Sequence, residues 1–184
     1  MSDNAKLDFY LQHRLQIEEW AALRTEAQQR LDDELLRAIA AIDVEDSTMK
    51  INTSNPRTVH FHLPAARRNV WVELNWRKSA LLTGPGLTAW PQIILVIRPG
   101  SLDPATRSAI IDATADLAIS DGMGQLGRAN DWWARWGSLT PHAEPIDIHT
   151  YAQYCALRFK EVWVRTRKDT AALLGRERPR PIEG

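Results

Sequence analysis

The residues best suited to chemistry lie on two segments in which polar and apolar residues alternate. Two histidines stand two residues apart on the first segment, and a glutamate, an asparagine and an arginine keep the same spacing on the second. With the neighbouring tryptophan, the set is His60, His62, Trp71, Glu73, Asn75 and Arg77. Side chains at positions i and i+2 of a strand point to the same face, roughly 6.6 Å apart along it. If the two segments pair, we expect all six side chains on one surface.

Such a surface could serve two kinds of chemistry. Arg77 and the histidines could bind an anion, whereas the two imidazoles and Glu73 could hold a metal ion. Catalytic zinc usually takes three protein ligands, and a third ligand besides the histidine pair is not established by the spacing. The simplest interpretation is a solvated sheet face, on which polar residues are what alternation requires. We predict a surface that binds a protein partner or an anionic ligand, with no metal ion and no cofactor.

The order of one helix, three strands and a later helix resembles that of the PD-(D/E)XK nucleases. The resemblance implies a metal-dependent hydrolase whose D/E-x-K triplet would be Glu73-Leu74-Asn75, with His60 and His62 nearby. Asparagine stands where that family has lysine, and residues 47–72 contain no aspartate or glutamate to complete the metal site. A hydrolase or nuclease-like enzyme is therefore the alternative to a non-enzymatic binding or adaptor domain.

Three tryptophans close together form a second candidate site. They are Trp132, Trp133 and Trp136. On a short helix the first and the last would share a face, with the middle one beside it. Aromatic clusters of this kind serve as interface hot spots or stacking platforms, although they more often attach an irregular segment to the core. We predict that these three tryptophans are further candidates for partner binding.

Two other motifs are better explained by structure than by chemistry. Residues 122–127 match G-x-G-x-x-G, but they follow a helical pattern instead of a strand, which is typical of a connection and not of a dinucleotide site. Cys155 is the only cysteine, which excludes an internal disulfide and a multi-cysteine zinc site. It falls on the apolar side of a predicted helix, where a thiol behaves as a small hydrophobic group.

Periodicity predicts the elements that position these residues. Residues 5–42 repeat apolar residues at steps of three and four, which predicts a long helix with a single apolar stripe and a possible break near Thr25. Alternation predicts three strands between residues 49 and 77, and the apolar run 93–97 predicts a fourth that is buried on both faces. We expect an α+β fold: a mainly antiparallel sheet of about four strands packed against the N-terminal helix and a C-terminal helix over residues 149–174.

Composition sets the remaining expectations. A length of 184 residues predicts one domain over residues 1–175, followed by a flexible tail over residues 176–184. Acidic and basic residues balance at 23 each, so a nucleic-acid partner is only weakly indicated, by local basic excesses of which the larger lies in residues 47–100. Neither a membrane span nor a secretory signal is visible. We therefore expect a cytoplasmic protein with a protein partner or a second copy of itself.

Overall fold

The computed structural model describes residues 3–44, 48–52, 55–62, 69–76, 90–114, 132–141 and 146–174. In these ranges the chain forms three helices and five strands, in the order helix, four strands, helix, strand, helix. The elements are α1 (Asp3–Ala40), β1 (Thr48–Ile51), β2 (Thr58–His62), β3 (Val70–Asn75), β4 (Gln92–Ile97), α2 (Pro104–Ala113), β5 (Trp133–Ser138) and α3 (Ile148–Leu174). The predicted tail over residues 176–184 lies outside the described residues.

The five strands form one antiparallel sheet in the order β1-β2-β3-β4-β5. The predicted α+β class is confirmed, but the strand count of about four is one too low. The additional strand is β5, in the tryptophan-rich segment that the sequence predicted to be irregular. That segment contains no alternation of polar and apolar residues, because three of its residues are tryptophans and a bulge interrupts its register.

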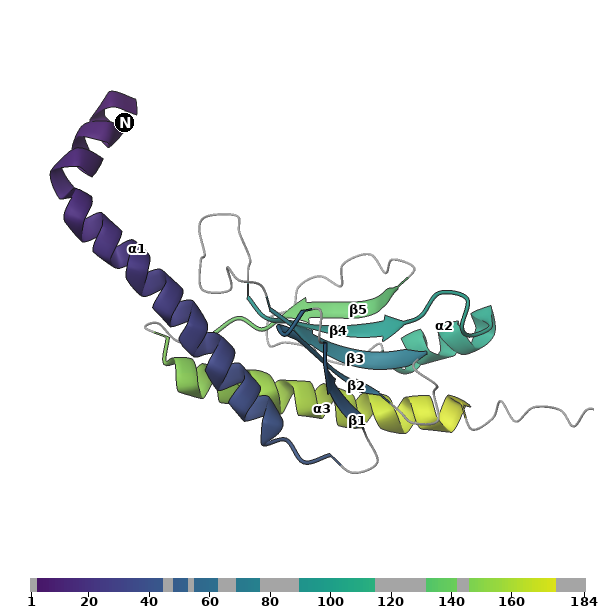
Figure 1. The fold of residues 1–184 in the computed structure, drawn as a ribbon. Helices are drawn as coiled ribbons and strands as arrows, with labels where there is room; N and C mark the ends of the chain where they lie inside the picture. Colours follow the sequence, from purple (N-terminus) through teal and green to yellow (C-terminus); the bar gives the residue numbers. More distant parts are fainter. Residues whose placement is uncertain are drawn as a thin grey trace, which may run out of the picture.

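The three helices and one face of the sheet enclose the hydrophobic core (Figure 1). Alternate residues of β2, β3 and β4 point into this core, together with the apolar sides of α1 and α3. At its centre the ring of Phe61 stacks on Phe159, with ring centroids 4.7 Å apart, and on Trp163 at 5.6 Å. Rings in this arrangement contribute about 1 kcal/mol beyond the area they bury. The α3 helix therefore fixes the position of the sheet.

A buried carboxylate joins α1 to the sheet. Asp32, 6% exposed, accepts hydrogen bonds from Gln28 Nε2 at 3.0 Å and from Trp76 Nε1 at 2.9 Å, and it pairs with the Arg57 guanidinium. Burial of a carboxylate is costly unless its oxygens are hydrogen-bonded and its charge is paired, and here both conditions are met. This cluster and the buried residues Leu31, Leu35 and Ile39 attach the C-terminal half of α1 to the body of the fold.

The N-terminal part of α1, residues 3–26, projects beyond the sheet and the other helices, and we call it the helical arm (Figure 1). None of its residues is buried. The backbone leaves helical geometry at His13 (φ −112°, ψ 15°), whereas α1 continues without interruption past Thr25, where the sequence predicted a possible break. Across this kink the Tyr10 hydroxyl donates to Glu18 at 2.6 Å, which holds the two sides of the bend together.

The α2 helix begins with a capping aspartate followed by a proline. The Asp103 carboxylate accepts hydrogen bonds from the backbone N–H groups of Ala105 at 2.9 Å and Thr106 at 3.0 Å, and Pro104 occupies the first turn. This satisfies donors that a helix start leaves without intrahelical partners. Of the helices that the structure describes, none is long and apolar enough to cross a membrane.

Candidate binding face

The sheet face turned away from the three helices carries most of the residues that the sequence singled out. We call it the helix-free face, since no helix among the described elements covers it. Strand register places its side chains in three rows across the sheet: His62–Trp71–Val96–Trp133, then His60–Glu73–Ile94–Trp136, then Thr58–Asn75–Gln92–Ser138. The face therefore changes from aromatic at one end of the strands to polar at the other.

A β-bulge brings two of the tryptophans together. Trp136 lies opposite Ile94, but the register shifts by one residue between Leu95 and Val96, so that Trp133 lies opposite Val96. Residues three apart on a regular strand point to opposite faces, and one extra residue restores them to the same face. The two indoles stand edge to face with centroids 6.4 Å apart. The bulge thus builds an aromatic pair that spacing alone would not predict.

On the other side of the sheet centre, two histidines surround a third tryptophan. The His60 and His62 rings meet edge to face at 4.4 Å, and their centroids lie 6.5 Å and 6.0 Å from that of Trp71. His62 is buried, whereas His60 and Trp71 are partly exposed. The predicted pairing of the two segments is confirmed, because His60 lies opposite Glu73 and His62 opposite Trp71.

Glu73 is held by two donors from its own strand. Its Oε1 accepts from Asn75 Nδ2 at 3.1 Å, and its Oε2 accepts from Trp71 Nε1 at 3.4 Å. Asn75 Nδ2 is also 3.3 Å from the Thr58 hydroxyl, which links β3 to β2. Both carboxylate oxygens therefore already have a hydrogen-bond donor from the protein. This arrangement orients a polar surface, and the structure describes no second carboxylate hydrogen-bonded to the same donors.

The floor of the face is apolar. Ile94 and Val96 on the central strand β4 point to the helix-free face, yet they are only 1% and 2% exposed. The prediction that residues 93–97 are buried on both faces is confirmed. Burial of these two side chains on the side away from the helices means that the partly exposed indoles of Trp71 and Trp136 rest on an apolar base, and a bound partner would extend this packing.

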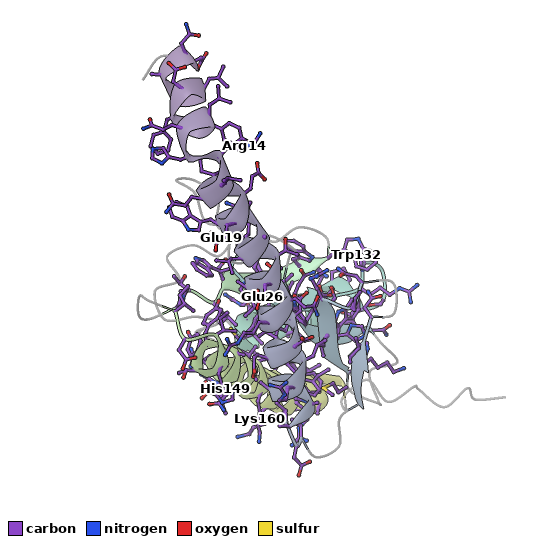
Figure 2. The ribbon with its side chains drawn as sticks, turned by 60° about the vertical axis from the view of Figure 1, so that its left-hand side comes forward. Arg14, Glu19, Glu26, Trp132, His149 and Lys160 are labelled. Atoms are coloured by element: carbon purple, nitrogen blue, oxygen red, sulfur yellow. The ribbon has the colours of Figure 1, made fainter. Side chains whose placement is uncertain are left out.

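The remaining predicted residues divide into two groups. Trp132 precedes β5 with about half of its side chain exposed, and its carbonyl accepts from the backbone of Ile97 at 2.9 Å (Figure 2). Arg77 lies outside the described residues, as does the glycine motif at 122–127. The structure therefore brings His60, His62, Trp71, Glu73 and Asn75 together with Trp133 and Trp136, which the sequence treated as a separate site.

The part of the chain that the structure describes contains no centre for metal or thiol chemistry. No group of three histidine, cysteine, aspartate or glutamate side chains there could hold a metal ion. Cys155 is fully buried on α3, and burial raises the pKa of its thiol to about 12, so the reactive thiolate is suppressed at neutral pH.

Sequence reasoning missed Ile94 and Val96 as parts of the site. Their signal was the absence of alternation along β4, which indicated a second apolar face without showing that this face carries the histidines and the tryptophans. No family model, curated protein or solved structure matches the chain. Its function must therefore be inferred from its own residues.

Proposed function

We propose that the chain is a non-enzymatic binding or adaptor domain that docks a protein segment on the helix-free face. The observation that carries the proposal is the convergence of Trp71, Trp133 and Trp136 on one face above the buried Ile94 and Val96. Tryptophan is enriched at the centres of protein interfaces, because a large ring buries much area at little cost in rotamer entropy.

A protein segment fits this face better than a small anion. Among the residues paired within the five strands, Lys50 on β1, which lies opposite His60, is the only lysine or arginine that the register places on the face. Arg57 and Arg135 sit elsewhere: the first pairs with Asp32, and the second donates to the Ile111 carbonyl on α2 at 3.0 Å. An anion site needs converging cations, whereas a face graded from aromatic to amide suits a peptide with apolar and polar side chains.

The hydrolase alternative gains no support from this geometry. His60 and His62 lie beside each other, but Glu73 turns both carboxylate oxygens to donors on its own strand. Asn75 stands where the nuclease family has lysine, and its side-chain amide donates a hydrogen bond to the Glu73 carboxylate. Binding is therefore the function that the site supports best.

The proposal can be tested by affinity enrichment from a lysate of the source organism on three immobilised proteins. These are the wild type, the double variant Trp133→Ala/Trp136→Ala, and Leu157→Ala as the matched control. Leu157 is 60% exposed on α3, so its removal subtracts exposed apolar area from a different surface. We expect specific protein partners to be captured by the wild type and the control, and capture to fall at least roughly tenfold with the double variant.

Circular dichroism of all three proteins must show the same fold for this comparison to hold. Equal capture by the three proteins would overturn the role of the helix-free face. Retention of zinc or manganese at one ion per chain, lost on His60→Ala, would favour the hydrolase alternative over a binding domain.

A further inference from the structure

The helical arm exposes more apolar surface than any other part of the described chain. Six of its large apolar side chains are each more than half exposed: Leu7, Phe9, Leu11, Leu15, Trp20 and Leu23. The apolar stripe that α1 buries at Leu31 and Leu35 continues outward along the arm through Ile17 and Trp20. Figure 2 shows Arg14 on the projecting part of α1, beyond the body of the fold.

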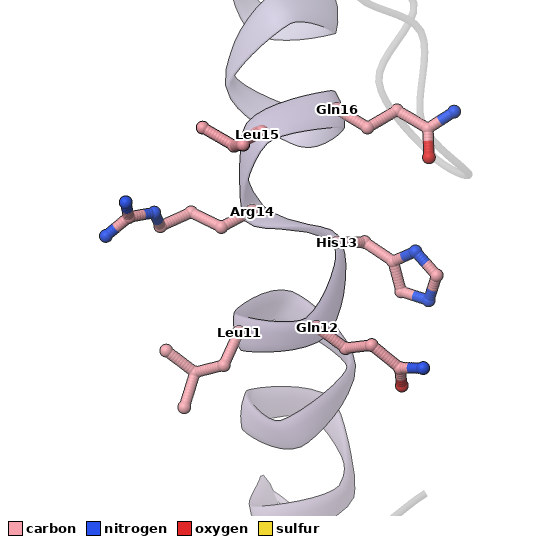
Figure 3. A pocket seen from close by; sticks show the side chains of 6 residues that line it. All are labelled: Leu11, Gln12, His13, Arg14, Leu15 and Gln16. Carbon is pink, nitrogen blue, oxygen red and sulfur yellow. The ribbon is translucent and has the colours of Figure 1, made fainter.

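A helix of this kind needs a partner. At 1.5 Å per residue, the arm extends about 36 Å. Most of the stability of helices in proteins comes from tertiary packing, and no residue of the arm is buried against the body. Its exposed apolar side chains amount to an area on the order of 600 Å², close to the roughly 800 Å² that each partner buries in a stable complex. Part of this area, at Leu11 and Leu15, lies on one side of the arm (Figure 3).

We propose that the arm pairs with the arm of a second copy of this chain, antiparallel and about a two-fold axis near Gln16. The order of charges along the arm supports this arrangement. Antiparallel pairing about Gln16 brings Lys6 to the level of Glu26, Asp8 to Arg24, and Arg14 to Glu18, each pair occurring twice. Parallel pairing in register would instead place every charge beside its own copy.

The length of the arm supports the same register. Gln28 is the first buried residue of α1, so the arm is free of the body up to residue 27. In the antiparallel pair, Ala5 of one copy lies at the level of Ala27 of the second. Each arm thus spans the free length of the other and ends where the body of the second copy begins.

The kink supplies a recess at the middle of this pair. A cavity of about 420 Å³ at the bend is lined by residues 11 to 16, among them Leu11, Leu15 and Arg14, which project to one side of α1 (Figure 3). Antiparallel pairing brings residues 16–21 of the second copy to this level, including Ile17 opposite Leu15.

Charge argues for a second copy over a lipid surface. Residues 3–26 contain three basic and five acidic residues, so the arm is acidic. Amphipathic helices that lie on membranes carry lysine and arginine on their polar face, which anionic lipids attract, whereas an acidic arm is repelled. The interface proposed for the helix-free face is separate from this one, since no arm residue contributes to it.

Sedimentation equilibrium of the full chain tests the proposal through a charge exchange. The wild type is expected to dimerise, and Arg24→Glu should weaken the dimer by roughly tenfold or more, because each of two attractive pairs becomes repulsive. Asp8→Arg should do the same. The double variant Asp8→Arg/Arg24→Glu restores opposite charges at both pairs, so it should recover most of the wild-type affinity.

A second set of variants separates loss of the interface from loss of the fold. Leu15→Glu/Trp20→Glu should give a monomer with the thermal midpoint of its body preserved, whereas Leu157→Glu on α3 should remain a dimer. A wild type that stays monomeric at all concentrations would overturn the proposal, as would a double charge exchange no tighter than either single change. Binding to vesicles of anionic phospholipid that Trp20→Glu abolishes would assign the arm to a membrane instead.

Discussion

The two faces of the sheet are built from the same strands but differ in which elements cover them. One face buries Val59, Phe61 and Val72 against α3 and α1, with ring stacking at its centre. The other face carries partly exposed tryptophans and a held carboxylate above two buried β4 side chains. On the first face the chain supplies its own cover, whereas on the second no described helix does so. Both sides of β4 are fully buried although the described helices lie on only one side, and this supports the proposal that the second face binds a partner.

The contrast predicts a large difference between aromatic deletions on the two faces. Phe61→Ala leaves a cavity between Phe159 and Trp163 and should lower the free energy of unfolding by about 3–5 kcal/mol. Trp136→Ala removes a ring that already contacts solvent and should cost about 1–2 kcal/mol. Urea denaturation of both variants at one fixed protein concentration provides the measurement.

Equal losses of unfolding free energy in the two variants would contradict this difference between the faces. They would mean that the helix-free face is packed as tightly as the core and offers no exposed surface to a partner. Leu157→Ala, on the exposed side of α3, sets the scale for a deletion without structural consequence, expected within about 0.5 kcal/mol of the wild type.

The core side of the sheet also buries titratable groups, and their effect on stability should be measurable at alkaline pH. Burial raises the pKa of the Cys155 thiol to about 12, and burial likewise raises the pKa of the neighbouring Tyr151 above its usual range. The unfolded thiol ionises near pH 8.5, so the stability contributed by the neutral thiol is complete below that pH and is lost as the pH rises toward 12. By pH 10, about 2 kcal/mol of it should be gone.

Cys155→Ala removes this dependence while retaining Tyr151. The difference in unfolding free energy between wild type and variant, measured by urea denaturation at pH 7 and pH 10, should therefore shrink at the higher pH. A constant difference would show that the thiol is not held neutral by the core. Because Cys155 is the only cysteine, reaction with a thiol reagent at pH 8 should also follow global unfolding.

Much of the fold could be predicted from periodicity. Alternation located β2 and β3 and assigned the correct face to His60, Phe61 and Glu73, since the side-chain period of a strand is two. Helical periodicity in α1 was equally clear, but an apolar stripe does not show which part of it the rest of the chain buries. The same stripe is buried at Leu35 and exposed at Trp20.

What could not be predicted depends on contacts between distant segments. The bulge that puts Trp133 and Trp136 on one face exists because β5 pairs with β4 some forty residues earlier in the chain, and no local signal marks it. Likewise, Asp32 gave no hint in the sequence that it would meet Arg57 and Trp76, since a charged residue on a helix is usually solvated. Local patterns fixed the faces of the strands, and long-range pairing combined two predicted sites into one.

The smallest effect should come from Glu73→Gln, and it bears on how the polar part of the helix-free face works. Glutamine keeps the length of the side chain and one oxygen that can accept from Asn75 Nδ2 or Trp71 Nε1, so only the charge is removed. We expect the unfolding free energy to change by less than about 0.5 kcal/mol and partner capture to be retained. If capture were lost while the fold stayed intact, the charge itself would contact the partner, which would then have to offer a cation at that position. A stability loss above about 2 kcal/mol would instead show that the ionised carboxylate is part of the structural framework of the sheet, as Asp32 is on the core side.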